Sequence, residues 1–360
     1  MNSDKVTMNA EFYFRDKIPV AILGATGTVG QKFVELLISH PWFEITALAA
    51  SERSVGKKYK DAVNWLMPTP LPPEIGNMVI KPCEPNFSCS IAFSALDSSI
   101  AGEVETSFAD AGYVVISNSS NHRMDPNVPL VVPEVNAEHL PLAKKTTNKG
   151  MIVTNPNCSV IGLTIALKPL FDQFGLEAVN VVTMQAISGA GYPGVSGLDI
   201  LDNVIPNITG EEEKIESEPL KIFGHFDGNA IIPAKFKISA QCNRVPVTDG
   251  HTECVSVKLK NKASKEDILA AWSQFKKEPE EQAYPSAPQM PIHYFEENFY
   301  PQPKLHRMRD KGMAVSIGRL RECPLFDYKF VILSHNTIRG AAGGSLLIAE
   351  LMVKQGYVFW

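Results

Sequence analysis

The sequence has few of the features that mark a secreted, membrane-bound or metal-binding protein. The six cysteines, at positions 83, 89, 158, 242, 254 and 323, form no Cys-x-x-Cys pair, which argues against a disulfide framework or a zinc site. No apolar run is long enough to span a membrane, and residues 1–17 mix charges of both signs without an apolar signal core. Lys and Arg form no long runs, and the net charge is −5, so the chain lacks the clustered positive charge that is typical of nucleic-acid-binding proteins. We therefore expect a cytoplasmic protein that binds no nucleic acid, no membrane and no metal.

Length and composition indicate a globular protein with more than one core. The chain has 360 residues, of which 44% are hydrophobic and 20% charged. That is longer than one ordinary domain and apolar enough to build real cores. We expect two domains.

A glycine-rich turn follows the first apolar run, residues 18–23, and precedes a helical pattern of apolar residues. Strand, glycine turn and helix N-terminus in this order bind the pyrophosphate of a dinucleotide, because glycine lets the backbone come close and the helix end supplies N–H donors. The GxxGxxG spacing leaves open a plain turn of some other α/β protein. The predicted cofactor contacts in this turn are Gly24, Thr26, Gly27, Thr28, Val29 and Gly30.

Polar side chains after the second predicted strand, residues 45–50, bear on which dinucleotide binds. An acid at this place usually binds the ribose hydroxyls of NAD, and Glu52 is close to it. Ser51, Arg53 and Ser54 instead offer two hydroxyls and a guanidinium, which suit the 2′-phosphate of NADP(H). The sequence favours NADP over NAD, unless Arg53 is an ordinary solvated loop charge.

Two further strand ends face the same crevice if the sheet is doubly wound. Ser94 and Ala95 end a buried run and are predicted to line the cofactor. The next buried run, residues 113–116, leads into a polar loop that carries Arg123. Such loops often bind anionic groups of a substrate, although a solvated surface loop is equally consistent with the composition.

The stretch 154–162, Thr-Asn-Pro-Asn-Cys-Ser-Val-Ile-Gly, is the centre of the chain. A buried strand precedes it and apolar residues at helical spacing follow, so Cys158 is predicted in the first turn of a helix. The unpaired N–H groups and positive dipole of that end favour thiolate over thiol. A buried structural cysteine is the alternative. His251, far along the chain, is a candidate partner, because thiol nucleophiles and their histidines are usually adjacent only in space.

The pattern changes after this helix. Long apolar or alternating runs at 178–187, 236–247, 252–259, 313–320 and 328–333 are interrupted by helices such as 265–275. They predict a largely antiparallel sheet covered by helices. The final helix, after the small residues 340–344, is expected to return to the first domain. The predicted fold is therefore α/β, with a nucleotide-binding Rossmann domain (1–157 and 335–360) and an α+β domain (158–334). Residues 276–309 give no clear pattern.

Taken together, these motifs resemble the aspartate-β-semialdehyde dehydrogenase family, in its archaeal and fungal branch. The resemblance runs from residue 20 to about 350, and its motifs are GATGTVG, SERSVG, PNCSV, QAISGAG, GEEEK, NRVPVTDGH and NTIRGAAGG. It implies a glyceraldehyde-3-phosphate-dehydrogenase-like second domain, assembly into homodimers or homotetramers through that domain, and an NADPH-dependent reaction. The reaction converts L-4-aspartyl phosphate to L-aspartate 4-semialdehyde and inorganic phosphate, toward threonine, methionine, isoleucine and in some organisms lysine.

The resemblance also implies roles for individual residues. Cys158 would be the nucleophile that forms a thioester, His251 the acid/base, and Gln185 the residue that orients the intermediate. Arg244 would bind the substrate carboxylate, Glu211 its ammonium group, and Lys214, Arg123 and Asn157 its phosphate. Ser188, Gly189 and Asn336 would line the nicotinamide. Glu211 is chosen from three consecutive glutamates because it lies one helical turn before Lys214; without the family, a solvated charged face would explain this cluster.

Three alternatives remain open at this stage. Malonyl-CoA reductase and N-acetyl-γ-glutamyl-phosphate reductase use the same thioester chemistry. The substrate of the second enzyme has no free ammonium group. A Glu/Lys pair that suits an amino acid therefore argues against this alternative. An NADP-sensing protein without catalysis is the third, but it would have no need of both Cys158 and His251.

Overall fold

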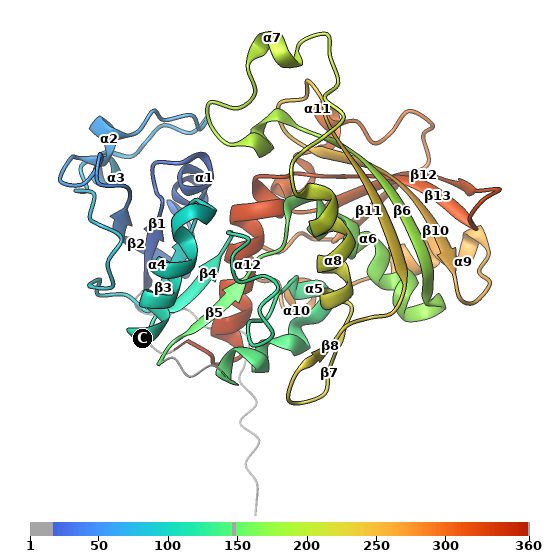
Figure 1. Cartoon of the computed structure of the whole chain (residues 1–360), viewed down its shortest axis with the longest axis horizontal. Helices are drawn as coiled ribbons and strands as arrows, with labels where there is room; N and C mark the ends of the chain where they lie inside the picture. Colours follow the sequence, from blue (N-terminus) through green and yellow to red (C-terminus); the bar gives the residue numbers. More distant parts are fainter. Residues whose placement is uncertain (1–16, 146–148, 359–360) are drawn as a thin grey trace, which may run out of the picture.

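The computed structural model describes residues 17–145 and 149–358, and the first 16 residues of the predicted first domain lie outside them. Figure 1 shows two lobes, each built on one sheet. The first sheet is parallel throughout, with strand order β2-β1-β3-β4-β5. Its strands are β1 (Ile18–Leu23), β2 (Phe43–Ala49), β3 (Ile91–Ser94), β4 (Val114–Ser117) and β5 (Met151–Thr154).

Helices cover both faces of this sheet, as a parallel sheet requires. On one face, the apolar sides of α1 (Thr28–Leu37) and α12 (Gly343–Lys354) share a core with Ile18, Val20 and Ile22 of β1. On the other face, α4 (Ser98–Asp110) packs on Ala21 and Leu23. The predicted return of the last helix to the first domain is confirmed, since α12 packs against β4 and shares the core of β1 (Figure 1). The domain boundaries at 157/158 and 334/335 stay predictions.

The second sheet has the order β11-β12-β13-β10-β6-β9 and is mixed, not simply antiparallel. Both edge pairings, β11–β12 and β6–β9, are parallel, whereas the three central pairings are antiparallel. A parallel pair needs a long crossover, and the chain between β6 and β9 supplies one that contains α8. The strands are β6 (Leu176–Gln185), β9 (Lys237–Arg244), β10 (His251–Leu259), β11 (Ile292–Phe295), β12 (Val315–Glu322) and β13 (Tyr328–Ser334).

Three helices cover one face of the second sheet. They are α6 (Cys158–Phe174), α8 (Glu211–Ile222) and α9 (Lys265–Ser273), and their apolar sides share one core with inward residues such as Val181 and Val255. Because side chains alternate along a strand, His251 and Val255 point to the same, α6-covered face. The region 276–309, without a clear pattern in sequence, contains α10 (Glu278–Glu281), β11 and α11 (Pro303–His306).

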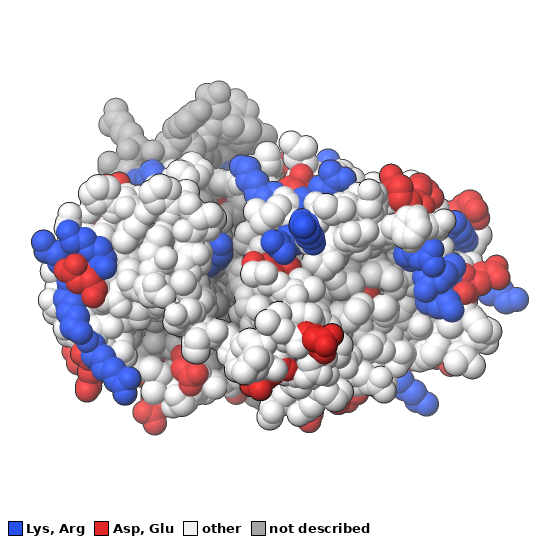
Figure 2. Space-filling view, turned by 90° about the horizontal axis from the view of Figure 1, so that it is seen from above, with Lys and Arg blue, Asp and Glu red and all other residues white. Residues whose placement is uncertain are grey.

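Short elements complete the described chain. They are α2 (Tyr59–Ala62), α3 (Pro73–Gly76), α5 (Pro133–Asn136), α7 (Gly197–Ile200), the two-stranded β7 (His225–Phe226) and β8 (Ile231–Ile232), the 3-10 helices η1 (Ala137–Lys145), η2 (Ile187–Ala190) and η3 (Arg309–Gly312), and the π-helical turn η4 (Ile338–Ala342). No helix among the described residues is both long and apolar enough to cross a membrane. Acidic and basic side chains are interspersed on the face seen in Figure 2.

Candidate active site

The turn 155–157 joins the end of β5 to the start of α6, and Cys158 is the first residue of that helix. Asn157 caps the helix: its Oδ1 accepts hydrogen bonds from the N–H groups of Ser159 (2.9 Å) and Val160 (3.4 Å). An asparagine cap of this kind satisfies two N–H groups that a helix start otherwise leaves unpaired. The predicted place of Cys158 at the helix N-terminus is therefore confirmed.

The sulfur of Cys158 lies 3.2 Å from Nε2 of His251, the first residue of β10. The other ring nitrogen, Nδ1, accepts a hydrogen bond from the backbone N–H of Ala186 (3.1 Å). Arg244, the last residue of β9, donates from Nη1 to the carbonyl of Ala186 (2.8 Å). Gln185 and Arg244 are register partners in the parallel pair β6–β9. The ends of β6 and β9 and the start of β10 thus bring these side chains to the thiol.

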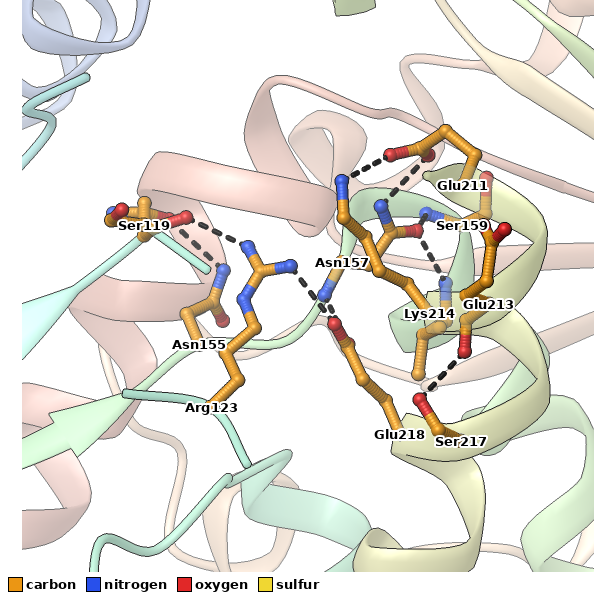
Figure 3. Close-up of polar contacts among 12 residues, drawn as sticks. Ser119, Arg123, Asn155, Asn157, Ser159, Glu211, Glu213, Lys214, Ser217 and Glu218 are labelled. Atoms are coloured by element: carbon orange, nitrogen blue, oxygen red, sulfur yellow. Dashed lines mark hydrogen bonds and ion pairs between the residues drawn. The ribbon is translucent and has the colours of Figure 1, made fainter. Parts of the chain in front are cut away.

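The start of α8 brings acidic and basic groups to the same place (Figure 3). Glu211 accepts hydrogen bonds from Lys214 Nζ (2.9 Å), Asn157 Nδ2 (2.8 Å) and Gln185 Nε2 (3.3 Å). Of the two glutamates that follow, Glu212 accepts the N–H of Cys242 (2.9 Å) and Glu213 is exposed. Only Glu211 of the three faces the thiol side.

Glu218 is a site residue that the sequence analysis missed. Its Oε1 forms an ion pair with Arg123 Nη1 (3.0 Å), and its Oε2 accepts the N–H of Asn157 (2.7 Å) (Figure 3). Glu218 follows Glu211 by seven residues, or two helical turns, so both lie on one face of α8. That spacing is the signal that could have revealed it. Arg123 is therefore charge-paired already, and it also donates to the carbonyl of Asn118 (2.7 Å).

A cavity of about 370 Å³ lies beside Cys158 and is lined by residues of both domains. Its lining comes from the first turn of α1, the loops after β3 and β4, η2, the starts of α6 and α8, and the segment that leads into η4. Predicted site residues that line it are Thr28, Val29, Arg123, Asn157, Cys158, Ser188, Gly189, Glu211, Lys214 and Asn336. Asn336 Nδ2 donates to Ser188 Oγ (2.8 Å), which ties two of them together.

The other predicted cofactor residues lie outside this cavity. Gly24, Thr26, Gly27 and Gly30 form the turn before and into α1. Gly24 has φ of +77°, and a Cβ on Gly30 would lie 2.2 Å from the Gly24 carbonyl oxygen, so both positions require glycine. Ser94 is the last residue of β3, which pairs with β1, and Ala95 follows it. Ser51 and Arg53 are exposed and Ser54 is half-buried, beyond the end of β2.

Burial sets the charge state of the central pair. It raises the pKa of the Cys158 thiol to about 12, with a further increase from the negative charge of Glu211, while Arg123 and Arg244 oppose this. Burial, aided by the positive charge of Arg244, lowers the pKa of His251 to about 3. The thiolate that the helix N-terminus led us to expect is thus not the resting form. Two residues along β10, Glu253 is also buried, and neither of its oxygens has a hydrogen-bond partner among the described residues.

Comparison with known proteins places this arrangement in a family. Residues 19–143 match the model described as semialdehyde dehydrogenase, NAD binding domain, and residues 167–339 match semialdehyde dehydrogenase, dimerisation domain. An aspartate-semialdehyde dehydrogenase of Archaeoglobus fulgidus is 51% identical over 93% of this chain and 98% of its own, and one of Candida albicans is 48% identical over 94% and 98%. A crystal structure of the Candida albicans enzyme with NADP superposes with a TM-score of 0.87 at 44% identity, covering 95% of this chain and 100% of that one. The chain belongs to the aspartate-semialdehyde dehydrogenase family.

Proposed function

We propose that this chain catalyses the NADPH-dependent reductive dephosphorylation of L-4-aspartyl phosphate to L-aspartate 4-semialdehyde, through a thioester on Cys158. The observation that carries the proposal is the placement of the thiol. Its sulfur is 3.2 Å from the His251 imidazole, and it lines one cavity with Thr28 and Val29 of the glycine-loop helix. Nucleophile and cofactor loop therefore share one space.

The start of α1 fits the pyrophosphate of NADP(H). This helix has ten residues, and its N-cap, Gly27, contributes no side-chain hydrogen bond, so the first N–H groups are free for an anion. A bound nicotinamide would supply the hydride. We assign the 2′-phosphate to Ser51, Arg53 and Ser54, because they lie beyond the end of β2, the strand next to β1. The Candida albicans relative, crystallised with NADP, supports this cofactor.

The charges around the cavity fit an amino-acid substrate with a phosphate. Arg244 is buried, and no carboxylate among the described residues forms an ion pair with it. A buried guanidinium without such a partner suits a bidentate bond to the substrate carboxylate. Glu211 can accept the substrate ammonium, while Lys214 and Arg123, with Asn157, provide donors for the phosphate.

The chemistry then follows from Cys158. Its sulfur forms a bond to the acyl carbon, the carbon–oxygen bond to phosphate breaks, and inorganic phosphate leaves. Reduction of the resulting thioester gives a hemithioacetal, which releases the aldehyde and restores the sulfur. We assign to Gln185, which is hydrogen-bonded to Glu211, the orientation of the acyl group, and to His251, whose Nε2 lies 3.2 Å from the sulfur, the acid/base role.

The test is an NADPH oxidation assay with aspartyl phosphate, N-acetyl-glutamyl phosphate and malonyl-CoA in parallel. We expect turnover with aspartyl phosphate and inactivity of Cys158→Ser, which should still bind NADPH because only the nucleophile is removed. Turnover by Cys158→Ser would refute the thioester, and a preference for malonyl-CoA would refute the substrate. The proposal also includes assembly as a homodimer or homotetramer through the second domain, a place in threonine, methionine and isoleucine synthesis, and action in the cytoplasm.

A further inference from the structure

Two charged residues of α8, Glu218 and Lys221, have no part in the mechanism proposed above. They follow Glu211 by seven and ten residues, so they lie on the same side of the helix. Both are buried. Both also reach from the second domain to the loop after β4, residues 118–128, which carries Arg123. The proposed function assigns Arg123 to the substrate phosphate, so the groups that hold it bear on how tightly phosphate binds.

Lys221 anchors the backbone of this loop. Its Nζ donates to the carbonyl oxygens of Arg123 (2.7 Å), Asp125 (2.8 Å) and Val128 (2.8 Å). An ammonium group has three donors, and these contacts use all of them. Lys221 therefore has no donor left for phosphate, and it holds the loop through the main chain, whatever partner the Arg123 side chain has.

Glu218 acts on the side chain of Arg123 instead (Figure 3). Its Oε1 lies 3.0 Å from Arg123 Nη1, and the two side chains are 2% and 9% exposed, so solvent screens this ion pair little. Its Oε2 accepts the N–H of Asn157 at 2.7 Å. One carboxylate thereby joins the guanidinium assigned to phosphate to the residue before the nucleophile. Arg123 lines the cavity, whereas Glu218 lies behind it and is not part of the lining.

The guanidinium of Arg123 keeps donors for a ligand. Its Nη2 donates to the carbonyl of Asn118 (2.7 Å), and its Nε is buried without a hydrogen-bond partner among residues 17–145 and 149–358. A guanidinium has five N–H donors, and the contacts with Glu218 and Asn118 account for two. Its positive charge, however, is already compensated by Glu218. The cation that should attract phosphate is thus one half of a neutral, buried pair.

We propose that Glu218 is a positioning residue that limits the affinity of the site for phosphate. Its carboxylate holds the guanidinium of Arg123 at the cavity and offsets its charge, so that phosphate is recognised by hydrogen bonds but is released once the C–O bond has broken. The inference rests on the proposed function, in which Arg123 binds the phosphate. Lys214 fits the same arrangement, because its ammonium is paired with Glu211 at 2.9 Å. Each of the two cations assigned to phosphate therefore has a glutamate beside it before phosphate arrives.

The first test measures KM for phosphate in the oxidation of the semialdehyde, where phosphate is a substrate. Glu218→Gln removes the negative charge and keeps the length of the side chain, so Arg123 should attract phosphate more strongly. We expect KM for phosphate to fall by roughly 10-fold, the order of one charge-assisted hydrogen bond. KM for the semialdehyde, whose carboxylate is assigned to Arg244, should not change. An unchanged or higher KM for phosphate would overturn the proposal.

Two variants control for charge and for position. Glu213→Gln removes the same charge from an exposed place on the same helix, so it should leave KM for phosphate unchanged. Glu218→Asp keeps the charge, so its KM for phosphate should stay close to that of the wild-type protein. A KM as low as that of Glu218→Gln in either control would contradict the role of the Glu218 charge.

A double-variant cycle separates this role from plain stabilisation of the fold. In Arg123→Gln the guanidinium is gone, so adding Glu218→Gln should no longer lower KM for phosphate. An equal decrease with and without Arg123 would contradict the proposal. Glu218→Met, of similar length, replaces the glutamine variant if that variant does not fold. Failure of both to fold would reject the proposal in favour of a structural role.

A binding measurement distinguishes failure of this inference from failure of the proposed function. Calorimetric titration of inorganic phosphate into the protein saturated with NADP gives Kd without turnover. We expect Kd to fall by roughly 10-fold in Glu218→Gln, in parallel with KM. Failure of the wild-type protein to turn over aspartyl phosphate would reject the proposed function, whereas an unchanged Kd for phosphate in Glu218→Gln would reject the role of Glu218 alone.

Discussion

Gly340 is a position at which a single added methyl group should displace the nucleophile. It lies in η4, and a Cβ built there would be 2.8 Å from Cβ of Cys158 and 3.0 Å from both Cα and the carbonyl oxygen of the same residue. Carbon atoms in ordinary contact are about 3.5–4.0 Å apart. Gly340→Ala therefore requires a shift of about 1 Å between η4 and the first turn of α6. Two of the three close atoms are backbone, so no side-chain rotation relieves the contact.

The shift should affect stability and catalysis differently. Extra methyl groups in packed interiors typically cost about 1–3 kcal/mol, which should lower the thermal midpoint by a few degrees. A displacement of about 1 Å at the nucleophile can cost about 100-fold in rate, because the sulfur must meet both the acyl carbon and His251. We expect kcat for phosphate-dependent semialdehyde oxidation, followed by NADPH absorbance, to fall by that order. Affinity for NADPH should remain close to that of the wild type, since the glycine loop is untouched.

Gly197→Ala is the matched control. Nothing lies within 4 Å of a Cβ at that position, so the same substitution should leave both rate and midpoint unchanged. If the Gly340→Ala variant had the same kcat as this control, the close packing of η4 on Cys158 would not constrain the position of the sulfur, and the reasoning would be refuted.

Three other predictions use the same structure. Arg53→Ala should lower the preference for NADPH over NADH in kcat/KM, because it removes the charge assigned to the 2′-phosphate; an unchanged ratio would place that phosphate elsewhere. Stability should decrease as the pH falls from 7 to 5, because burial lowers the pKa of His251 to about 3 and that of His335 to about 4, from 6.5. Below pH 6.5 the unfolded chain binds protons that the folded chain does not, at a cost of roughly 2 kcal/mol for each histidine by pH 5; an unchanged denaturant midpoint would contradict this. Glu253→Leu should raise the free energy of unfolding at pH 7 by roughly 1–3 kcal/mol, since it removes a buried carboxyl that has no hydrogen-bond partner among residues 17–145 and 149–358; a lower thermal midpoint would contradict this.

Local features of the site could be predicted from sequence because they depend on neighbours along the chain. The glycine turn before α1 and the Asn157 cap before Cys158 each depend on a few consecutive residues, and strand, turn and helix follow in the predicted order. The pairing of Glu211 with Lys214 follows from one helical turn. The distance between Cys158 and His251 does not, because it depends on how α6 packs on β10. The residues alone made His251 a candidate partner, and the family resemblance gave it a role.

Features that depend on packing were missed for the same reason. The ion pair of Glu218 with Arg123 joins residues 95 positions apart, and the parallel edges of the second sheet depend on where a crossover returns. The charge state of Cys158 was misjudged because the helix N-terminus is visible in sequence, whereas the burial that raises the thiol pKa is not.

The packing of Gly340 on Cys158 has a consequence for biosynthesis. The ribosome releases the thiol-bearing segment before η4 and α12 are synthesised, so the face of the first sheet that α1 and α12 share is at first covered by α1 alone, and Gly340 does not yet pack on Cys158. A nascent or prematurely terminated chain would thus carry a half-built pocket and an unshielded cysteine. The pocket is therefore completed, and the sulfur covered, only once η4 and α12 have been synthesised.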